Sequence, residues 1–94
     1  MPKNAPDELR RIPGIGPRMA ADLRRLGIHR VEDLRGADPQ ALYDRLGEMD
    51  GVRHDRCVLY VFRCAVYYAS TFPHDPELLL WWSWKDGGAA YGSA

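Results

Sequence analysis

The chain has 94 residues, of which 46% are hydrophobic, and its 13 basic and 13 acidic side chains give a formal net charge of zero. This length favours one domain with a modest core. Neutrality argues against a strong nucleic-acid binder, and no apolar run approaches the roughly 20 residues that span a bilayer. The N-terminal segment is polar and carries no secretory signal. We therefore expect a cytoplasmic protein without a membrane partner.

The charge is unevenly distributed along the chain. Residues 1–36 contain eight Lys or Arg residues against five Asp or Glu residues, whereas residues 37–94 contain five against eight. Because residues 1–36 are basic and also carry an anion-binding motif, they are the part of the chain expected to contact nucleic acid.

Proline and glycine divide the N-terminal third into short helical segments. The first predicted helix spans residues 6–12 and ends before Pro13, because proline disfavours helical geometry in the residue that precedes it. The second spans residues 17–26, where Pro17 can begin a helix without losing a needed amide and Gly27 can end it in a left-handed cap.

Further helices are expected over residues 31–35, 39–50, 54–70 and 77–82. Asp38 should cap the second of these and Gly51 should end it. The helix over residues 54–70 is apolar around most of its circumference, which is typical of a central helix. Residues 87–94 are rich in Gly, Ala and Ser and are predicted to be a disordered tail.

Two helix-turn-helix units are visible in this pattern. The first has Gly14 and Gly16 in its turn, and the second, around residues 50–53, lacks the double glycine. No segment shows the alternation of a strand. We predict an all-α fold of five to six short helices with a SAM-like architecture, in which residues 1–86 form one domain and the first of two tandem helix-hairpin-helix units is intact, the second degenerate.

The first turn has the chemistry of an anion site. Gly14 and Gly16 permit unusual backbone angles and a close approach by another molecule, and Ile15 is expected to point back between the helices. The turn amides and the positive end of the following helix would face one outside point, as at known anion sites. The expected donors are the amides of Gly14, Ile15, Gly16 and Arg18. The Arg18 side chain would add a charge there.

Residues 9–23 read Leu-x-x-Ile-Pro-Gly-Ile-Gly-Pro-Arg-x-Ala-x-x-Leu. This segment resembles the helix-hairpin-helix motif of DNA repair and recombination proteins, over about residues 7–28. The resemblance implies non-specific binding of duplex backbone. It also implies, more weakly, a monovalent cation held by carbonyls of the hairpin, and no other cofactor is expected.

A second resemblance covers most of the chain. It rests on residues 12–17, on Asp-Arg-Cys-Val-Leu-Tyr-Val-Phe-Arg-Cys-Ala-Val-Tyr-Tyr at 55–68, and on Trp-Trp-x-Trp-Lys-Asp at 81–86. These segments are similar to the bacterial "pathogenicity locus" family, a resemblance that implies the fold more than the function.

The second turn carries basic residues of its own. A positive side chain at the positive N-terminal end of a helix is electrostatically unfavourable. Arg53 at this position therefore indicates an anionic partner, and the equally good alternative is that it is simply solvated at the helix end. His54 is better explained by pairing with Asp50 or Asp55. The candidate nucleic-acid-binding residues are Gly14, Ile15, Gly16, Arg18, Arg25 and Arg53.

Several other side chains have a structural explanation that we favour. Arg56 and Arg63 lie on one face of an apolar helix and need partners, which Asp44 and Glu48 could supply. Cys57 and Cys64 would lie about 10 Å apart on one helix, too far for a disulfide, and with His54 and His74 they do not form a metal-ligand pattern. We expect core cysteines and no metal.

The three tryptophans Trp81, Trp82 and Trp84 cannot all face the same way on a short helix. At least one is expected to close the core, while another could lie on the surface and mark a partner or dimer interface. No catalytic constellation is evident, so we expect no enzyme. The predicted function is sequence-independent binding of DNA backbone, double- or single-stranded, and the alternative is a protein-protein or dimerisation module that uses the tryptophans.

Overall fold

The computed structural model describes residues 8–86, which contain three α-helices, four 3₁₀-helices and no strand. The α-helices are α1 (Pro17–Arg25), α2 (Pro39–Asp50) and α3 (Arg56–Ser70). The 3₁₀-helices are η1 (Glu8–Arg11), η2 (Val31–Leu34), η3 (Pro76–Leu79) and η4 (Trp81–Trp84). The all-α prediction is confirmed, although several of the expected helices are single 3₁₀ turns. The predicted tail, residues 87–94, lies outside the described residues.

The helix ends follow the local signals. Asp38 caps α2 by accepting a hydrogen bond from the Gln40 amide at 3.0 Å, and Gly51 ends the helix with φ of 68°. Gly27, with φ of 90°, follows α1, and the Ile28 amide donates to the Leu23 carbonyl at 2.9 Å. This bond closes a Schellman-type cap, as the glycine predicts.

Two of the differences from the predicted helix bounds have a clear cause. Helix α3 begins at Arg56 rather than at residue 54, because the Asp55 side chain caps it by accepting from the Cys57 amide at 2.9 Å. The helix expected over residues 77–82 is split into η3 and η4. The Ser83 hydroxyl and the Trp84 indole donate to carbonyls of residues 77 and 78, both at 2.8 Å, and thereby take the acceptors that a continuous α-helix would use.

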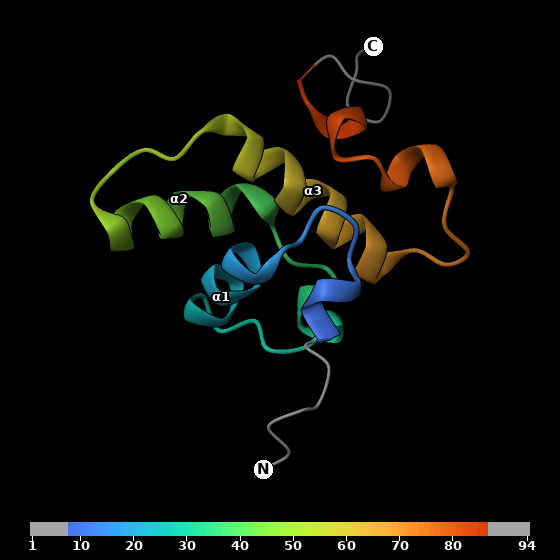
Figure 1. The fold of residues 1–94 in the computed structure, drawn as a ribbon, viewed down its shortest axis with the longest axis horizontal. Helices are drawn as coiled ribbons and strands as arrows, with labels where there is room; N and C mark the ends of the chain where they lie inside the picture. Colours follow the sequence, from blue (N-terminus) through green and yellow to red (C-terminus); the bar gives the residue numbers. More distant parts are fainter. Residues whose placement is uncertain (1–7, 87–94) are drawn as a thin grey trace.

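Helix α3 is the centre of the fold, as its apolar sequence predicts. It packs side by side with α2 and also contacts η2, η3 and η4 (Figure 1). Leu59, Phe62 and Ala65 are fully buried on it. Helix α1 lies on the same side of the molecule as η1, and its Ala20 and Leu23 enter the same core (Figure 1). The first turn is thereby held against the middle of the fold.

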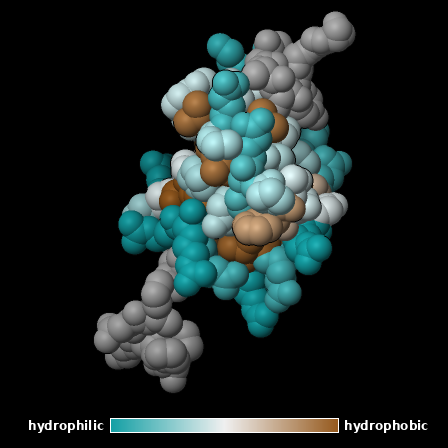
Figure 2. Space-filling model, turned by 90° about the vertical axis from the view of Figure 1, so that its right-hand side faces the viewer, coloured by the Kyte–Doolittle hydropathy of each residue, from teal (hydrophilic) through white to brown (hydrophobic). Residues whose placement is uncertain are grey.

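The surface gives two further facts. None of the helices formed by residues 8–86 is long and apolar enough to cross a membrane. Figure 2 shows the face that carries residues 76–86, which contain η3 and η4 and are called the C-terminal segment below. Apolar patches on this face are separated by hydrophilic residues.

Candidate nucleic-acid interface

The turn between η1 and α1 is built by a proline and a left-handed glycine. The Ile15 amide donates to the Ile12 carbonyl at 3.0 Å, and Gly14 has φ of 88°. Pro13 and Gly14 thus occupy the positions that favour them in a type II turn. Ile15 is 5% exposed and fills the space between the helices, as predicted. The expectation that its amide would face a ligand was wrong, because the turn itself uses this donor.

Four other amides of this segment have no acceptor within residues 8–86: those of Gly14, Gly16, Arg18 and Met19. The first amide bonded inside α1 is that of Ala20, which donates to the Gly16 carbonyl at 2.9 Å. Unpaired amides in the first turn are a general property of helices. That rule identifies the Met19 donor, which the motif alone did not. The Arg18 side chain is exposed beside these donors.

A groove of about 420 Å³ joins this turn to the N-terminus of α3. Its walls include Gly16, Arg18 and Met19 on one side and His54, Asp55 and Val58 on the other. Two acids also line the groove, Asp22 and Asp55. Asp22 is paired with Arg25, and the Asp55 carboxylate caps α3 through its bond with the Cys57 amide, which lowers its pKa and keeps it negatively charged. Residues from the two predicted hairpin units therefore meet at one surface.

Arg25 lies at the opposite end of α1 from the turn. It pairs with Asp22 at 3.2 Å and with Asp50 at the end of α2. Asp50 also contacts His54 Nε2 at 2.7 Å, which confirms the favoured explanation of His54. The hydrogen bond from Arg25 and then that from His54 lower the pKa of Asp50. Arg25 therefore links α1 to α2 rather than standing beside the turn amides.

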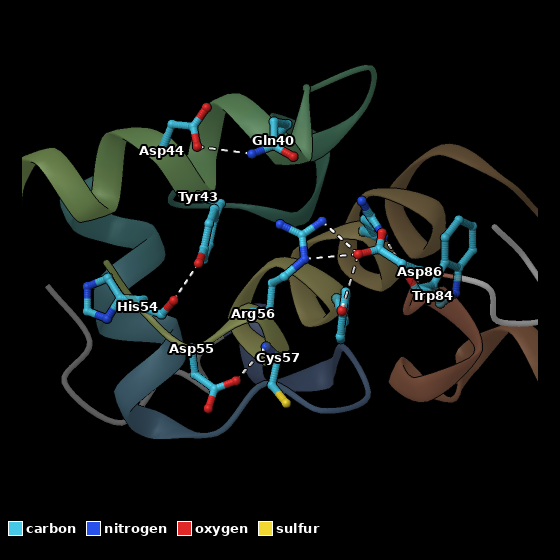
Figure 3. Close-up of polar contacts among 11 residues, drawn as sticks. Gln40, Tyr43, Asp44, His54, Asp55, Arg56, Cys57, Trp84 and Asp86 are labelled. Carbon is cyan, nitrogen blue, oxygen red and sulfur yellow. Dashed lines mark hydrogen bonds and ion pairs between the residues drawn. The ribbon is translucent and has the colours of Figure 1, made fainter. Parts of the chain in front are cut away.

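Arg53 is exposed and has no acidic partner within the described part of the chain. It lines hollows of about 480 and 260 Å³ together with Tyr43, Asp44 and His54. The Tyr43 hydroxyl donates to the His54 carbonyl and fixes the backbone next to Arg53 (Figure 3). The candidate nucleic-acid-binding residues therefore lie in three places. Gly14, Gly16 and Arg18 are at the first turn, Arg53 is at the second turn, and Arg25 belongs to an ion pair that joins α1 to α2.

Comparison with known proteins places the chain in a family. Residues 2–89 match the pathogenicity locus family (Cdd1). The chain belongs to this family. It is 33% identical over 75 residues to the mitomycin resistance protein McrB of Streptomyces lavendulae, covering 80% of this chain and 68% of that protein.

Two DNA polymerases also share similarity with this family member. DNA polymerase IV 2 of Methanosarcina mazei is 46% identical over 39 residues, which cover 42% of this chain and 11% of the polymerase. DNA polymerase IV of Moorella thermoacetica is 35% identical over 71 residues, which cover 73% and 16%. The chain thus spans only a small part of either polymerase. No solved structure matches it.

In this member of the pathogenicity locus family, the C-terminal segment is bound to α3 by one carboxylate. Arg56 donates to Asp86 Oδ2 from Nε at 2.9 Å and from Nη2 at 2.7 Å (Figure 3). Arg63 Nη1 donates to Asp86 Oδ1 at 3.0 Å. Arg63 is only 7% exposed and also donates to the Trp84 carbonyl. The prediction that Asp44 and Glu48 would pair with Arg56 and Arg63 was wrong. Asp86 reaches both arginines because η3 and η4 fold back over α3.

The tryptophans divide as expected between core and surface. Trp81 packs against the hydrophobic core, and the Trp84 ring lies 5.3 Å from that of Tyr67. Trp82 is 51% exposed. A partner surface at this segment would therefore use Trp82 and its exposed neighbour Leu80 rather than all three indoles.

The two cysteines occupy different environments. Cys64 is buried, as expected, and both cysteines are free thiols. The expectation of a core cysteine was wrong for Cys57, which is exposed because it lies in the first turn of α3. Within residues 8–86, no three His, Cys, Asp or Glu side chains converge as metal ligands. Burial raises the pKa of the Cys64 thiol to about 11, as expected for a core cysteine.

Proposed function

We propose that this member of the pathogenicity locus family binds the phosphate backbone of DNA without reading its sequence. The observation that carries the proposal is the set of amides at Gly14, Gly16, Arg18 and Met19 that have no acceptor within residues 8–86, beside the exposed Arg18 side chain. Amides at a helix N-terminus favour anions through their hydrogen bonds and through the helix dipole. Because every phosphate presents the same oxygens, such contacts carry no sequence information.

The similarity to two DNA polymerases IV supports DNA as the anion. In this proposal η1, the turn and α1 act as a helix-hairpin-helix motif, and α2 and α3 act as a degenerate second unit. Arg53, which is exposed in the turn just before α3, would contact a second phosphate. Ile15 would contribute by holding the turn in shape.

The proposal needs no cofactor and involves no catalytic step. A monovalent cation could bind at the turn, since the carbonyl oxygens of Pro13, Gly14 and Ile15 accept no hydrogen bond within the described residues. Oxygen ligands of this kind suit hard cations. Binding measured in potassium, sodium and tetramethylammonium salts would reveal whether such an ion contributes.

Fluorescence anisotropy with a labelled duplex tests the proposal directly. With two to four phosphate contacts we expect a dissociation constant of about tens of micromolar and a slope of log K against log salt of about −2 to −4. Unrelated duplexes of equal length should bind equally. A zero salt slope, or a strong preference for one sequence, would contradict the proposal.

Gly16→Val is the sharpest variant for this test. A β-carbon at Gly16 meets nothing within 4 Å, and φ of −93° suits any residue, so the fold should be preserved. The new side chain would stand before the amides and weaken duplex binding about tenfold, the loss expected for a charge-assisted hydrogen bond. Ala41→Val, on an exposed position of α2, is the matched control. Undiminished binding by Gly16→Val would exclude the turn as the site.

The alternative function is association through the C-terminal segment. It is favoured by the exposed side chains of Trp82 and Leu80. Sedimentation of wild type and Trp82→Ala over a range of concentrations tests self-association. A monomer in both cases would leave DNA binding as the better-supported function.

A further inference from the structure

A hollow of about 530 Å³ lies at the end of α3 that is opposite the groove. It is lined by Arg35, by residues 68–72 and by His74. The Gly36 amide donates to Ser70 Oγ at 3.2 Å, so the turn after η2 is tied to the end of α3. The two sides of the hollow are therefore held together by the fold. The proposed duplex site uses none of these residues.

One wall of the hollow is aromatic. The His74 ring stacks on Tyr68 with centroids 4.6 Å apart and planes 14° apart, and His74 Nε2 donates to the Tyr68 carbonyl at 2.8 Å. These two contacts fix the orientation of the imidazole. The Phe72 ring meets His74 edge to face at 5.6 Å and is otherwise in water, with 88% of the residue exposed. Most of the Phe72 ring is therefore accessible to another flat ring.

The rest of the hollow supplies polar groups of two kinds. The carbonyl oxygens of Ala69 and Ser70 accept no hydrogen bond within residues 8–86, because α3 ends here and Pro73 has no amide hydrogen to offer. The exposed guanidinium of Arg35 has no acidic partner among the same residues. A matching ligand would combine a flat ring, hydrogen-bond donors on its edge and a negative charge.

We propose that this hollow binds an unpaired nucleotide. Its base stacks on Phe72, an amino group on the base edge donates to the carbonyl of Ala69 or Ser70, and its phosphate lies at Arg35. In a duplex the faces of a base are covered and its edge is paired, so only an unpaired base offers both. The inference goes beyond the proposed backbone binding and shares with it only the choice of nucleic acid as ligand.

The test uses the full chain and two labelled probes, the single strand (dC)6 and a duplex closed by GC pairs at both ends. Base-aromatic stacking contributes enough that Phe72→Leu should weaken (dC)6 binding about fivefold or more. Duplex binding should be unchanged. Phe72→Trp keeps an aromatic face and should retain (dC)6 binding. Because the residue is exposed, neither variant should alter the melting temperature.

Arg35→Gln tests the phosphate contact against a matched control. It should weaken (dC)6 binding, whereas Arg45→Gln, which removes an exposed arginine on α2, should weaken it less. Equal losses for the two variants would mean that only overall charge matters and would overturn the assignment of Arg35.

Three outcomes would overturn the inference as a whole: no binding of (dC)6, equal (dC)6 binding by wild type and Phe72→Leu, or equal weakening of single strand and duplex by Phe72→Leu. Binding at the duplex site is tested independently of binding at the Phe72 hollow. Loss of duplex binding in Gly16→Val with Phe72-dependent binding of (dC)6 intact would support both sites. Absence of duplex binding in the wild type, with Phe72-dependent binding of (dC)6, would contradict the proposed function alone.

Discussion

Trp81 lies against Gly14, although the two residues are 67 positions apart along the chain. A β-carbon at residue 14 would lie 3.7 Å from Trp81 Cδ1 and 3.8 Å from Val61 Cγ1. The glycine therefore serves two purposes: it adopts φ of 88°, and it lets the indole and α3 approach the turn. The far side of the turn stays open, since nothing lies within 4 Å of a β-carbon at Gly16.

This contact predicts unequal roles for adjacent tryptophans. Trp81→Ala removes a ring that packs on the core and should lower the free energy of unfolding by about 2 to 3 kcal/mol. Trp82→Ala removes a half-exposed ring and should lower it by less than about 1 kcal/mol. Urea denaturation followed by circular dichroism measures both values. Equal losses would show that Trp81 does not buttress the turn.

Two arginines of α1 should separate binding from stability. Arg18→Gln removes an exposed charge beside the turn amides, so it should weaken duplex binding and leave the melting temperature unchanged. Arg25→Gln removes the link from α1 to Asp50, so it should lower the melting temperature. Anisotropy and thermal melting on the same samples provide the comparison. If Arg25→Gln weakened binding more than Arg18→Gln in folded protein, the site would lie at the other end of α1.

The Asp86 carboxylate gives a prediction about pH. The arginines, Arg56 first and then Arg63, hold the pKa of Asp86 below its usual range. A carboxyl group whose pKa is lower in the folded state contributes stability above its unfolded pKa, about 3.9, and loses it as the pH falls through the folded value. Asp86→Asn should therefore lower the melting temperature at neutral pH.

The same variant supplies its own control in acid. As the pH falls from about 4 through the lowered folded-state pKa of Asp86, the melting temperatures of wild type and Asp86→Asn should converge, because the wild-type carboxyl group then becomes protonated too. A difference that stayed constant with pH would mean that the ion pairs with Arg56 and Arg63 do not hold the C-terminal segment.

The two thiols should differ in reactivity. Cys57 is exposed, although its hydrogen bond with Asp55 raises the pKa of its thiol. Cys64 is buried, and burial raises its pKa to about 11, so it is both inaccessible and almost fully protonated at neutral pH. N-ethylmaleimide should modify one thiol rapidly in the native protein and the second only on unfolding. Cys57→Ser should abolish the rapid reaction, and Cys64→Ser should not. Mass spectrometry of timed samples distinguishes them, and equal rates for both thiols would contradict the described core.

Much of the local structure could be predicted because its causes are local. Pro17 and Gly27 bound α1, Asp38 and Gly51 bound α2, and the apolar circumference of α3 identifies the central helix. Ile15 could be assigned to the interior because Pro13 and Gly14 favour a turn that points the next apolar side chain back between the helices. These features depend on backbone geometry and on helical periodicity within a few residues.

Motif reasoning was less reliable about individual donors. It assigned the Ile15 amide to a ligand, whereas the turn uses that amide for its own hydrogen bond to Ile12. It also missed the amide of Met19. Both follow from counting the hydrogen bonds of the folded turn and of the first helical turn, which requires the backbone path and not only the residue types.

The sequence by itself determined the helical class of the fold, most helix ends and the turn with its two glycines. Only the tertiary structure decided which charges meet. Arg25 pairs with Asp50, which lies 25 positions later in the chain, and Arg56 pairs with Asp86, which lies 30 positions later. Such pairs depend on how α1, α3 and the C-terminal segment pack in three dimensions, because long charged side chains pair with whatever acid the folded chain brings within reach.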